Sequence, residues 1–93
     1  MFGIFKVQGD SMYPSLSAGD FVVTCRFYRK LAIGDLVVFK HKNYGRLIKR
    51  IADVASSGAL RLAGENDASV NSQQIGWVAK HDLLGLVLFK IRR

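Results

Sequence analysis

Two residues of the 93-residue chain, Ser11 and Lys49, are of types that together could carry out nucleophilic catalysis. Ser11 stands in the stretch QGDSMYPSL (8–16). A serine hydroxyl is a weak nucleophile at neutral pH and needs a base that removes its proton. Local sequence also fits a second interpretation, in which Asp10 and Ser11 cap a turn through side-chain hydrogen bonds and Pro14 fixes the backbone that follows.

Lys49 is the stronger of the two candidates because of its neighbours in RLIKRIA (46–52). In an extended strand, alternation places Leu47, Lys49 and Ile51 on one face, with Arg46 and Arg50 on the other. A lysine between two large aliphatic side chains loses solvation of its charged form, which lowers its pKa and makes it a candidate general base. The alternative is that Lys49 lies at a strand edge and extends its amine to water.

The remaining reactive residues offer neither a better base nor a metal site. His41 and His81 stand among lysines and an aspartate, in stretches expected to be polar loops. The single cysteine, Cys25, lies in an apolar run and is expected to be a buried small hydrophobe. No metal-ligand spacing and no phosphate-binding glycine loop occurs in the sequence, so we expect no metal and no cofactor.

The apolar segments are short, rich in Val, Ile, Leu and Phe, and separated by turn signals, which is typical of a mainly β domain. The expected strands lie within residues 21–25, 36–40, 46–52, 59–63, 75–79 and 83–91. No segment sustains helical periodicity over ten residues, and single helical turns are expected only near 13–16 or 80–84. We therefore predict one compact domain over residues 1–93, with Trp77 in its core and contact of Trp77 with a ligand or a membrane as the alternative.

The net charge of +7 suits an acidic partner, nucleic acid or an anionic membrane surface. The basic residues are dispersed and no recognition helix is predicted, so we expect no nucleic-acid partner. The apolar runs are far shorter than the ~20 residues of a membrane-spanning helix, and the first residues lack the features of a signal peptide. The expectation is a soluble, cytoplasmic protein with no transmembrane anchor, and peripheral membrane contact remains an open alternative.

Four stretches, taken in order, resemble the motifs of the signal peptidase I family. They are GDSMYPSLSAGD, GDLVVF, LIKRI and GENDASVNSQQIGWV, and together they span about residues 7–87. The first three are also similar to motifs of the self-cleaving repressor peptidases. Both groups are serine peptidases with a Ser/Lys dyad, and the resemblance implies their compact β domain of short, coiled antiparallel strands.

The resemblance implies that Ser11 is the nucleophile and Lys49 the general base. It also implies that the backbone N–H of Ser11 donates to the oxyanion, and that Gly9, Asp10 and Met12 border the oxyanion hole or the substrate groove. Many bacterial signal peptidases carry a serine where this chain has Gly9, so a second oxyanion donor cannot be that side chain. Packing of Met12 in the core is the alternative to its place in the groove.

The last motif departs further from the family. Ser69 matches the serine that orients the base lysine. Asn71 and Gln73 stand where the family has an aspartate and its arginine partner. An amide pair leaves no unpaired charge, so Asn71 and Gln73 are expected to be structural, with exposed loop positions as the alternative.

The resemblance therefore predicts a serine endopeptidase that removes a leader or cuts a specific site in a protein substrate. Its substrate would bind as an extended strand, with small residues before the cut. Among small soluble members, the chain resembles the maturation protease of nickel-type superoxide dismutase. The alternative function is a non-catalytic or regulatory β-rich binding module with the repressor-peptidase fold.

Overall fold

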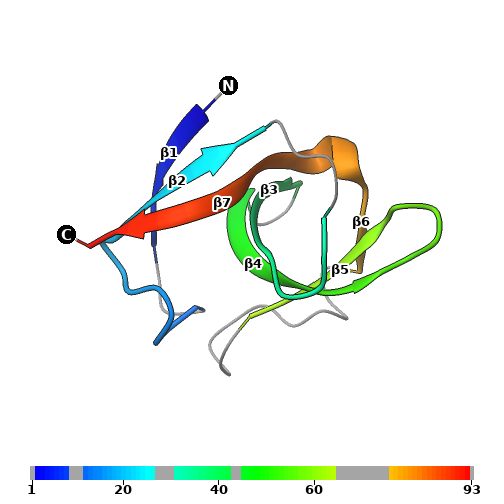
Figure 1. The fold of residues 1–93 in the computed structure, drawn as a ribbon, viewed down its shortest axis with the longest axis horizontal. Coiled ribbons are helices and arrows are strands. Elements are labelled where there is room, and N and C mark those ends of the chain that lie inside the picture. Colours follow the sequence, from blue (N-terminus) through cyan, green and yellow to red (C-terminus); the bar gives the residue numbers. More distant parts are fainter. Residues whose placement is uncertain (1, 9–11, 27–30, 43–44, 65–75, 93) are drawn as a thin grey trace.

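The structure, a computed structural model, describes residues 2–8, 12–26, 31–42, 45–64 and 76–92. These residues form one antiparallel sheet in the order β1-β2-β7-β3-β4-β5-β6 (Figure 1). Its strands are β1 (Phe2–Lys6), β2 (Phe21–Cys25), β3 (Leu36–His41), β4 (Gly45–Val54), β5 (Leu60–Ala63), β6 (Trp77–Val78) and β7 (Leu83–Ile91), and a 3-10 helix, η1, spans Lys80–Asp82. Within these ranges no helix is long and apolar enough to cross a bilayer. The mainly β fold predicted from the sequence is confirmed.

The sheet is strongly coiled, and its two halves meet at β7. Figure 1 shows β1, β2 and β7 side by side, while β3, β4 and β5 curve around the other half of the domain. The register of β7 shifts opposite Val23/Thr24 of β2 and again opposite Val38/Phe39 of β3. Such bulges increase the local twist, and this twist lets a single sheet fold back on itself.

Strand β3 lies at the centre of the sheet and is buried on both faces, as its continuous apolar run suggests. Val37 and Phe39 belong to the larger core, while Val38 faces the smaller core. The larger core consists of Leu31, Val37, Phe39, Ile51, Leu60, Leu62, Val78 and Leu83. The smaller core consists of Val7, Met12, Leu16, Val22 and Val38.

Two matching turns begin strands β2 and β3. In SAGD (17–20) the backbone N–H of Ser17 donates to the Asp20 carboxylate at 3.0 Å, and in AIGD (32–35) that of Ala32 donates to Asp35 at 3.0 Å. The glycine at the third position of each turn has a positive φ, +93° for Gly19 and +99° for Gly34. This conformation, found in type II turns, explains why glycine stands there.

Two expectations about the elements were wrong. The sequence analysis did not predict β1, because Phe2, Gly3, Ile4 and Phe5 lack polar–apolar alternation. Trp77, expected in the core, is 48% exposed. It lies opposite Arg61 of β5, whose guanidinium is 5.1 Å from the indole centroid.

The expected burial of Cys25 is confirmed. His41 forms the last residue of β3 rather than part of a loop.

Strands β1, β2 and β7 approach closely around one side chain, that of Thr24. Thr24 is 1% exposed and lies opposite Gly3 of β1, whose carbonyl accepts a 3.3 Å hydrogen bond from the Thr24 hydroxyl. A Cβ added at Gly85 of β7 would lie 2.7 Å from the Thr24 Cβ, and one at Gly3 would lie 2.9 Å from its Oγ1. Glycine on both neighbouring strands is therefore what makes room for Thr24.

Replacement of Gly85 by alanine tests this packing. We expect Gly85→Ala to lower the free energy of unfolding by about 1–3 kcal/mol, because the new methyl group overpacks a filled site. Urea denaturation measures the loss. In a Thr24→Gly background the same substitution should cost markedly less, and an equal cost in both backgrounds would contradict the proposed contact.

Candidate active site

Lys49 is buried in the middle of β4, on the face of the larger core. Its side chain is 1% exposed, and it lies opposite Val37 of β3 in the strand register. Ile51, two residues on, is equally buried, whereas Arg46 is exposed and Arg50 partly so. The predicted alternation of RLIKRIA is therefore confirmed, and Lys49 does not extend its amine to water.

Burial lowers the pKa of the Lys49 amine from its ordinary value of 10.5. The physical cause is desolvation, because an ammonium ion loses its hydration in an apolar environment more than a neutral amine does. A lowered pKa increases the fraction of neutral amine near physiological pH. This neutral form is the one that can accept a proton, which is the property required of a general base.

Two backbone hydrogen bonds join the described residues that precede and follow Ser11 in the sequence. Val7 N–H donates to the Asp20 carbonyl at 2.7 Å, and Gly19 N–H donates to the Val7 carbonyl at 2.9 Å. After Ser11, the Leu16 N–H donates to the Met12 carbonyl at 2.8 Å, and both side chains are buried in the smaller core.

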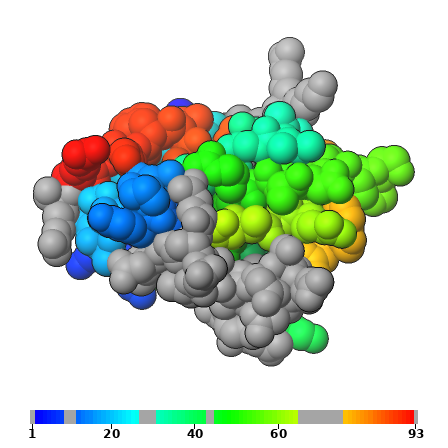
Figure 2. All heavy atoms as spheres, turned by 90° about the horizontal axis from the view of Figure 1, so that it is seen from below, coloured from blue at the N-terminus to red at the C-terminus, as the bar shows by residue number. Residues whose placement is uncertain are grey.

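The segment that follows Ser11 is also held against β7, since the Lys90 amine donates to the Ser15 carbonyl at 2.6 Å. Figure 2 shows the segment from Met12 onward lying next to β7.

Six of the residues proposed for the site lie outside the described residues. They are Gly9, Asp10, Ser11, Ser69, Asn71 and Gln73. Their assigned roles stay predictions that rest on the family resemblance. Lys49 and Met12 are described, and Met12, the residue after Ser11, is 2% exposed. Met12 both packs in the smaller core and lines the groove described next, so its two expected roles are compatible.

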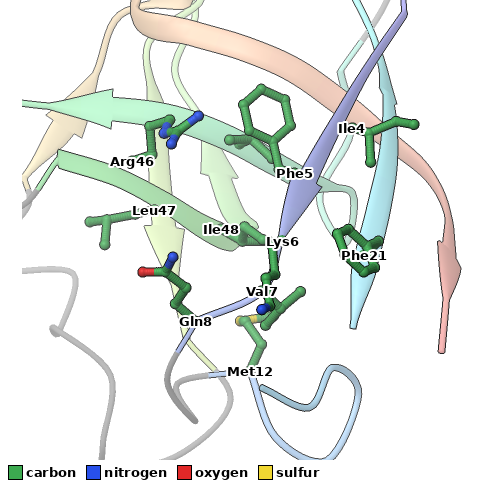
Figure 3. A pocket seen from close by; sticks show the side chains of 11 residues that line it. Ile4, Phe5, Lys6, Val7, Gln8, Met12, Phe21, Arg46, Leu47 and Ile48 are labelled. Carbon is green, nitrogen blue, oxygen red and sulfur yellow. The ribbon is translucent and has the colours of Figure 1, made fainter. Parts of the chain in front are cut away.

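A groove of about 550 Å³ runs between β1 and the first half of β4 (Figure 3). One wall is formed by the chain from Ile4 to Gln8, and the other by Arg46, Leu47 and Ile48. Met12, Phe21 and Val38 complete the lining. The groove therefore borders residues that directly adjoin both Ser11 and Lys49 in the sequence.

Both walls of the groove are strand edges that can accept a further strand. β1 is the first strand of the sheet and pairs with β2 alone among the described strands. β5 pairs with β4 only from Arg50 to Val54, which leaves Gly45–Lys49 with no described partner on that side. Unpaired N–H and C=O groups along an edge are the usual site for an added peptide strand.

The groove carries positive charge. Lys6 and Arg46 are the charged residues of its described lining, which contains no acidic residue. The Arg46 guanidinium lies 5.5 Å from the centroid of the Phe5 ring, a cation–π contact that spans from β4 to β1. The sequence analysis missed most of this lining, although several of these residues flank the two candidate catalytic residues and could have been selected on that ground.

The chain belongs to the Peptidase S24-like family, whose model matches residues 2–88. This match confirms the predicted resemblance at the level of this peptidase-like family. A search of curated proteins finds no match. The family, the coiled antiparallel sheet and the buried lysine in its core together define a peptidase-like hydrolase domain.

Replacement of Lys49 by methionine tests the cost of its burial. Between the lowered pKa and 10.5 the unfolded chain holds more protons than the native one, so the stability of the wild type rises with pH across this window. Below the window the native state carries the full cost of a buried charge. We therefore expect Lys49→Met to stabilise the domain in urea denaturation at pH 7, and the gain to shrink as the pH approaches 10.5.

Lys40→Met is the matched control, because Lys40 is an exposed lysine on the adjacent strand. It should change stability by no more than ~0.5 kcal/mol. A Lys49→Met variant that is less stable than the wild type, or a gain independent of pH, would contradict the burial of an ionisable amine.

Proposed function

We propose that the chain is a serine endopeptidase of the signal-peptidase type that uses Ser11 as its nucleophile and Lys49 as its general base. The observation that carries this proposal is the buried Lys49 amine, whose pKa is lowered and whose neighbour in the sequence, Ile48, lines a groove. The two strand edges of this groove have no partner among the described strands. Membership of the Peptidase S24-like family supports the same class of reaction. The substrate would be a protein from which a leader or a specific segment is cut.

Acylation would begin when neutral Lys49 takes the hydroxyl proton of Ser11 as its oxygen attacks the scissile carbonyl. The C–N bond then breaks, and the ammonium of Lys49 returns the proton to the leaving amine. The acyl group remains on the Ser11 oxygen as an ester. The neutral Lys49 then removes a proton from water, whose oxygen attacks the ester. The ester C–O bond breaks, and the Lys49 ammonium returns the proton to the Ser11 oxygen as the carboxylic acid leaves.

The negative oxygen formed in each step needs preorganised donors. The resemblance assigns one donor to the backbone N–H of Ser11, and loss of a single such donor typically costs about 3–4 kcal/mol of transition-state stabilisation. Gly9 has no side-chain hydroxyl, so it cannot supply a second oxyanion donor in that way. Ser69 would accept or donate a hydrogen bond that orients Lys49, and Asn71 and Gln73 would support that segment without charge.

Substrate would bind as an extended strand in the groove between β1 and β4. Met12, Leu47 and Ile48 offer an apolar lining for the side chains of this strand. The family resemblance predicts small side chains before the cut. The chain would thus trim a leader in the manner of the nickel-type superoxide dismutase maturation protease, a small soluble member of the signal-peptidase type.

Peptide cleavage tests the dyad directly. We expect the wild type to cut peptides with an Ala-X-Ala leader, and the rate to rise with pH along a limb that lies below 10.5, as Lys49 loses its proton. Ser11→Ala and Lys49→Met should each lower kcat by at least about 10³-fold.

The controls for this experiment are Ser15→Ala and Lys40→Met, which change a nearby serine and an exposed lysine. Both should retain wild-type kcat. Cleavage that survives in Ser11→Ala, or a pH profile that is unchanged in Lys49→Met, would contradict the proposed roles.

The groove is tested by a substitution that fills it. Gln8 is exposed and lines the groove, so Gln8→Trp should keep the fold while raising KM for the peptide at least tenfold. The Gln8→Trp variant should melt within a few degrees of the wild type. An unchanged KM would place the substrate elsewhere.

A non-catalytic peptide-binding module is the second candidate. The observation that favours it is that the outer edges of β1 and of the first half of β4 have no partner among the described strands. In that case peptides would bind the wild type and Ser11→Ala with equal affinity by fluorescence polarisation, and no peptide would be cut.

A further inference from the structure

The outer surface of β1, β2 and β7 exposes large apolar side chains. Together Phe2, Ile4, Phe21, Phe89 and Ile91 form what we term the outer apolar face. Their exposure ranges from 37% for Phe21 to 72% for Phe2. Apolar residues scattered singly on a surface are ordinary, but a contiguous group of aromatic and aliphatic side chains is typical of an interaction site.

The strand register shows that these residues are contiguous. Ile4 lies opposite Val23, which lies opposite Phe89, so that one row crosses all three strands. Phe21 lies opposite Ile91 in the next row of the same face. Because side chains alternate between the two faces of a sheet, residues in these rows all point to one side. The opposite side carries Val22, which is buried in the smaller core.

Basic residues border this face. Lys6 lies opposite Phe21 on the same side, and the exposed Arg26 and Arg92 directly follow β2 and β7. No aspartate or glutamate occurs in residues 2–6, 21–26 or 83–92. The surface is thus apolar in its centre and positive at its margins, within a chain whose net charge is +7.

This charge distribution argues against a second copy of the chain as the occupant. A two-fold contact through the outer apolar face would bring the same basic residues of both copies together, which is unfavourable. An anionic lipid surface has the complementary pattern, with negative head groups above a hydrocarbon layer. Aromatic side chains such as Phe2 and Phe89 insert into such an interface, and each nearby basic side chain strengthens binding about fivefold.

We propose that the outer apolar face docks the chain onto anionic membrane surfaces. Phe2, Ile4 and Phe89 would enter the lipid interface, while Lys6, Arg26 and Arg92 would contact anionic head groups. Ile4 and Phe21 also line the groove, so the groove opens at the margin of the docked face. Docking does not depend on the peptidase reaction, and the two proposals can fail separately.

Vesicle co-sedimentation tests the proposal with the full chain carrying Ser11→Ala, so that cleavage plays no part. We expect binding to vesicles of phosphatidylglycerol and phosphatidylcholine in equal amounts, at least tenfold weaker binding to pure phosphatidylcholine, and weakening as salt is raised. Phe2→Ser/Phe89→Ser should reduce binding to the anionic vesicles at least tenfold. Arg26→Glu/Arg92→Glu should do the same.

Matched controls lie elsewhere on the surface. Ile33 is as exposed as Ile4, at 66%, and lies in the turn before β3, so Ile33→Ser should bind as the wild type does. Lys40→Glu/Lys42→Glu changes two exposed lysines and should retain at least half of the binding. Circular dichroism melts establish that each variant is folded.

Three results would overturn the proposal. The first is no binding to anionic vesicles by the folded wild type. The second is an equal loss of binding in the Ile33→Ser control. The third is a dimer in sedimentation velocity that Phe2→Ser/Phe89→Ser converts to a monomer, which would assign the face to a second copy.

Discussion

The pairing of β4 with β3 is the constraint on which both the fold and the site depend. In this register Lys49 lies opposite Val37 and Arg50 lies opposite Leu36. A slip by one residue would turn Lys49 toward the other face and bring the arginines into the larger core, so the register is strongly specified. The side chain of Arg50 adds a further restraint, because its guanidinium donates to the Gly34 carbonyl at 2.8 Å and ties β4 to the turn before β3.

Burial of the Lys49 amine opposes folding and favours chemistry at the same time. A methionine of similar volume would fit the larger core without the desolvation cost. An ionisable side chain in an otherwise apolar core is typical of functional sites. At such sites a lower free energy of unfolding accompanies a more reactive group. The residue before Lys49, Ile48, lines the groove, on the stretch of β4 where an added peptide strand could pair.

Much of the fold could be predicted from the sequence, because alternation and Gly-Asp turns are local signals. They identified β2, β3, β4, β5 and β7, and they placed Lys49 on the apolar face of β4. The same signals failed for β1, where Phe2 and Ile4 are exposed and Phe5 is partly buried, so that apolar residues occupy both faces. They also failed for Trp77, because propensity does not say which side of an edge strand faces solvent. The groove was out of reach, since it depends on two strand edges distant in the sequence that the coiling of the sheet brings together.

The position of β7 has a consequence for how the domain assembles. β7 lies between β2 and β3 in the sheet, although about sixty residues separate it from β2 along the chain. Among the described strands, β1–β2 and β3–β5 share no pairing except through β7, so each pair or meander exposes an edge until β7 is in place. Strand pairs so distant in sequence form slowly, because a long loop must be closed before the contacts stabilise it. We therefore expect the two halves to become one cooperative unit only when β7 inserts between them, late in folding.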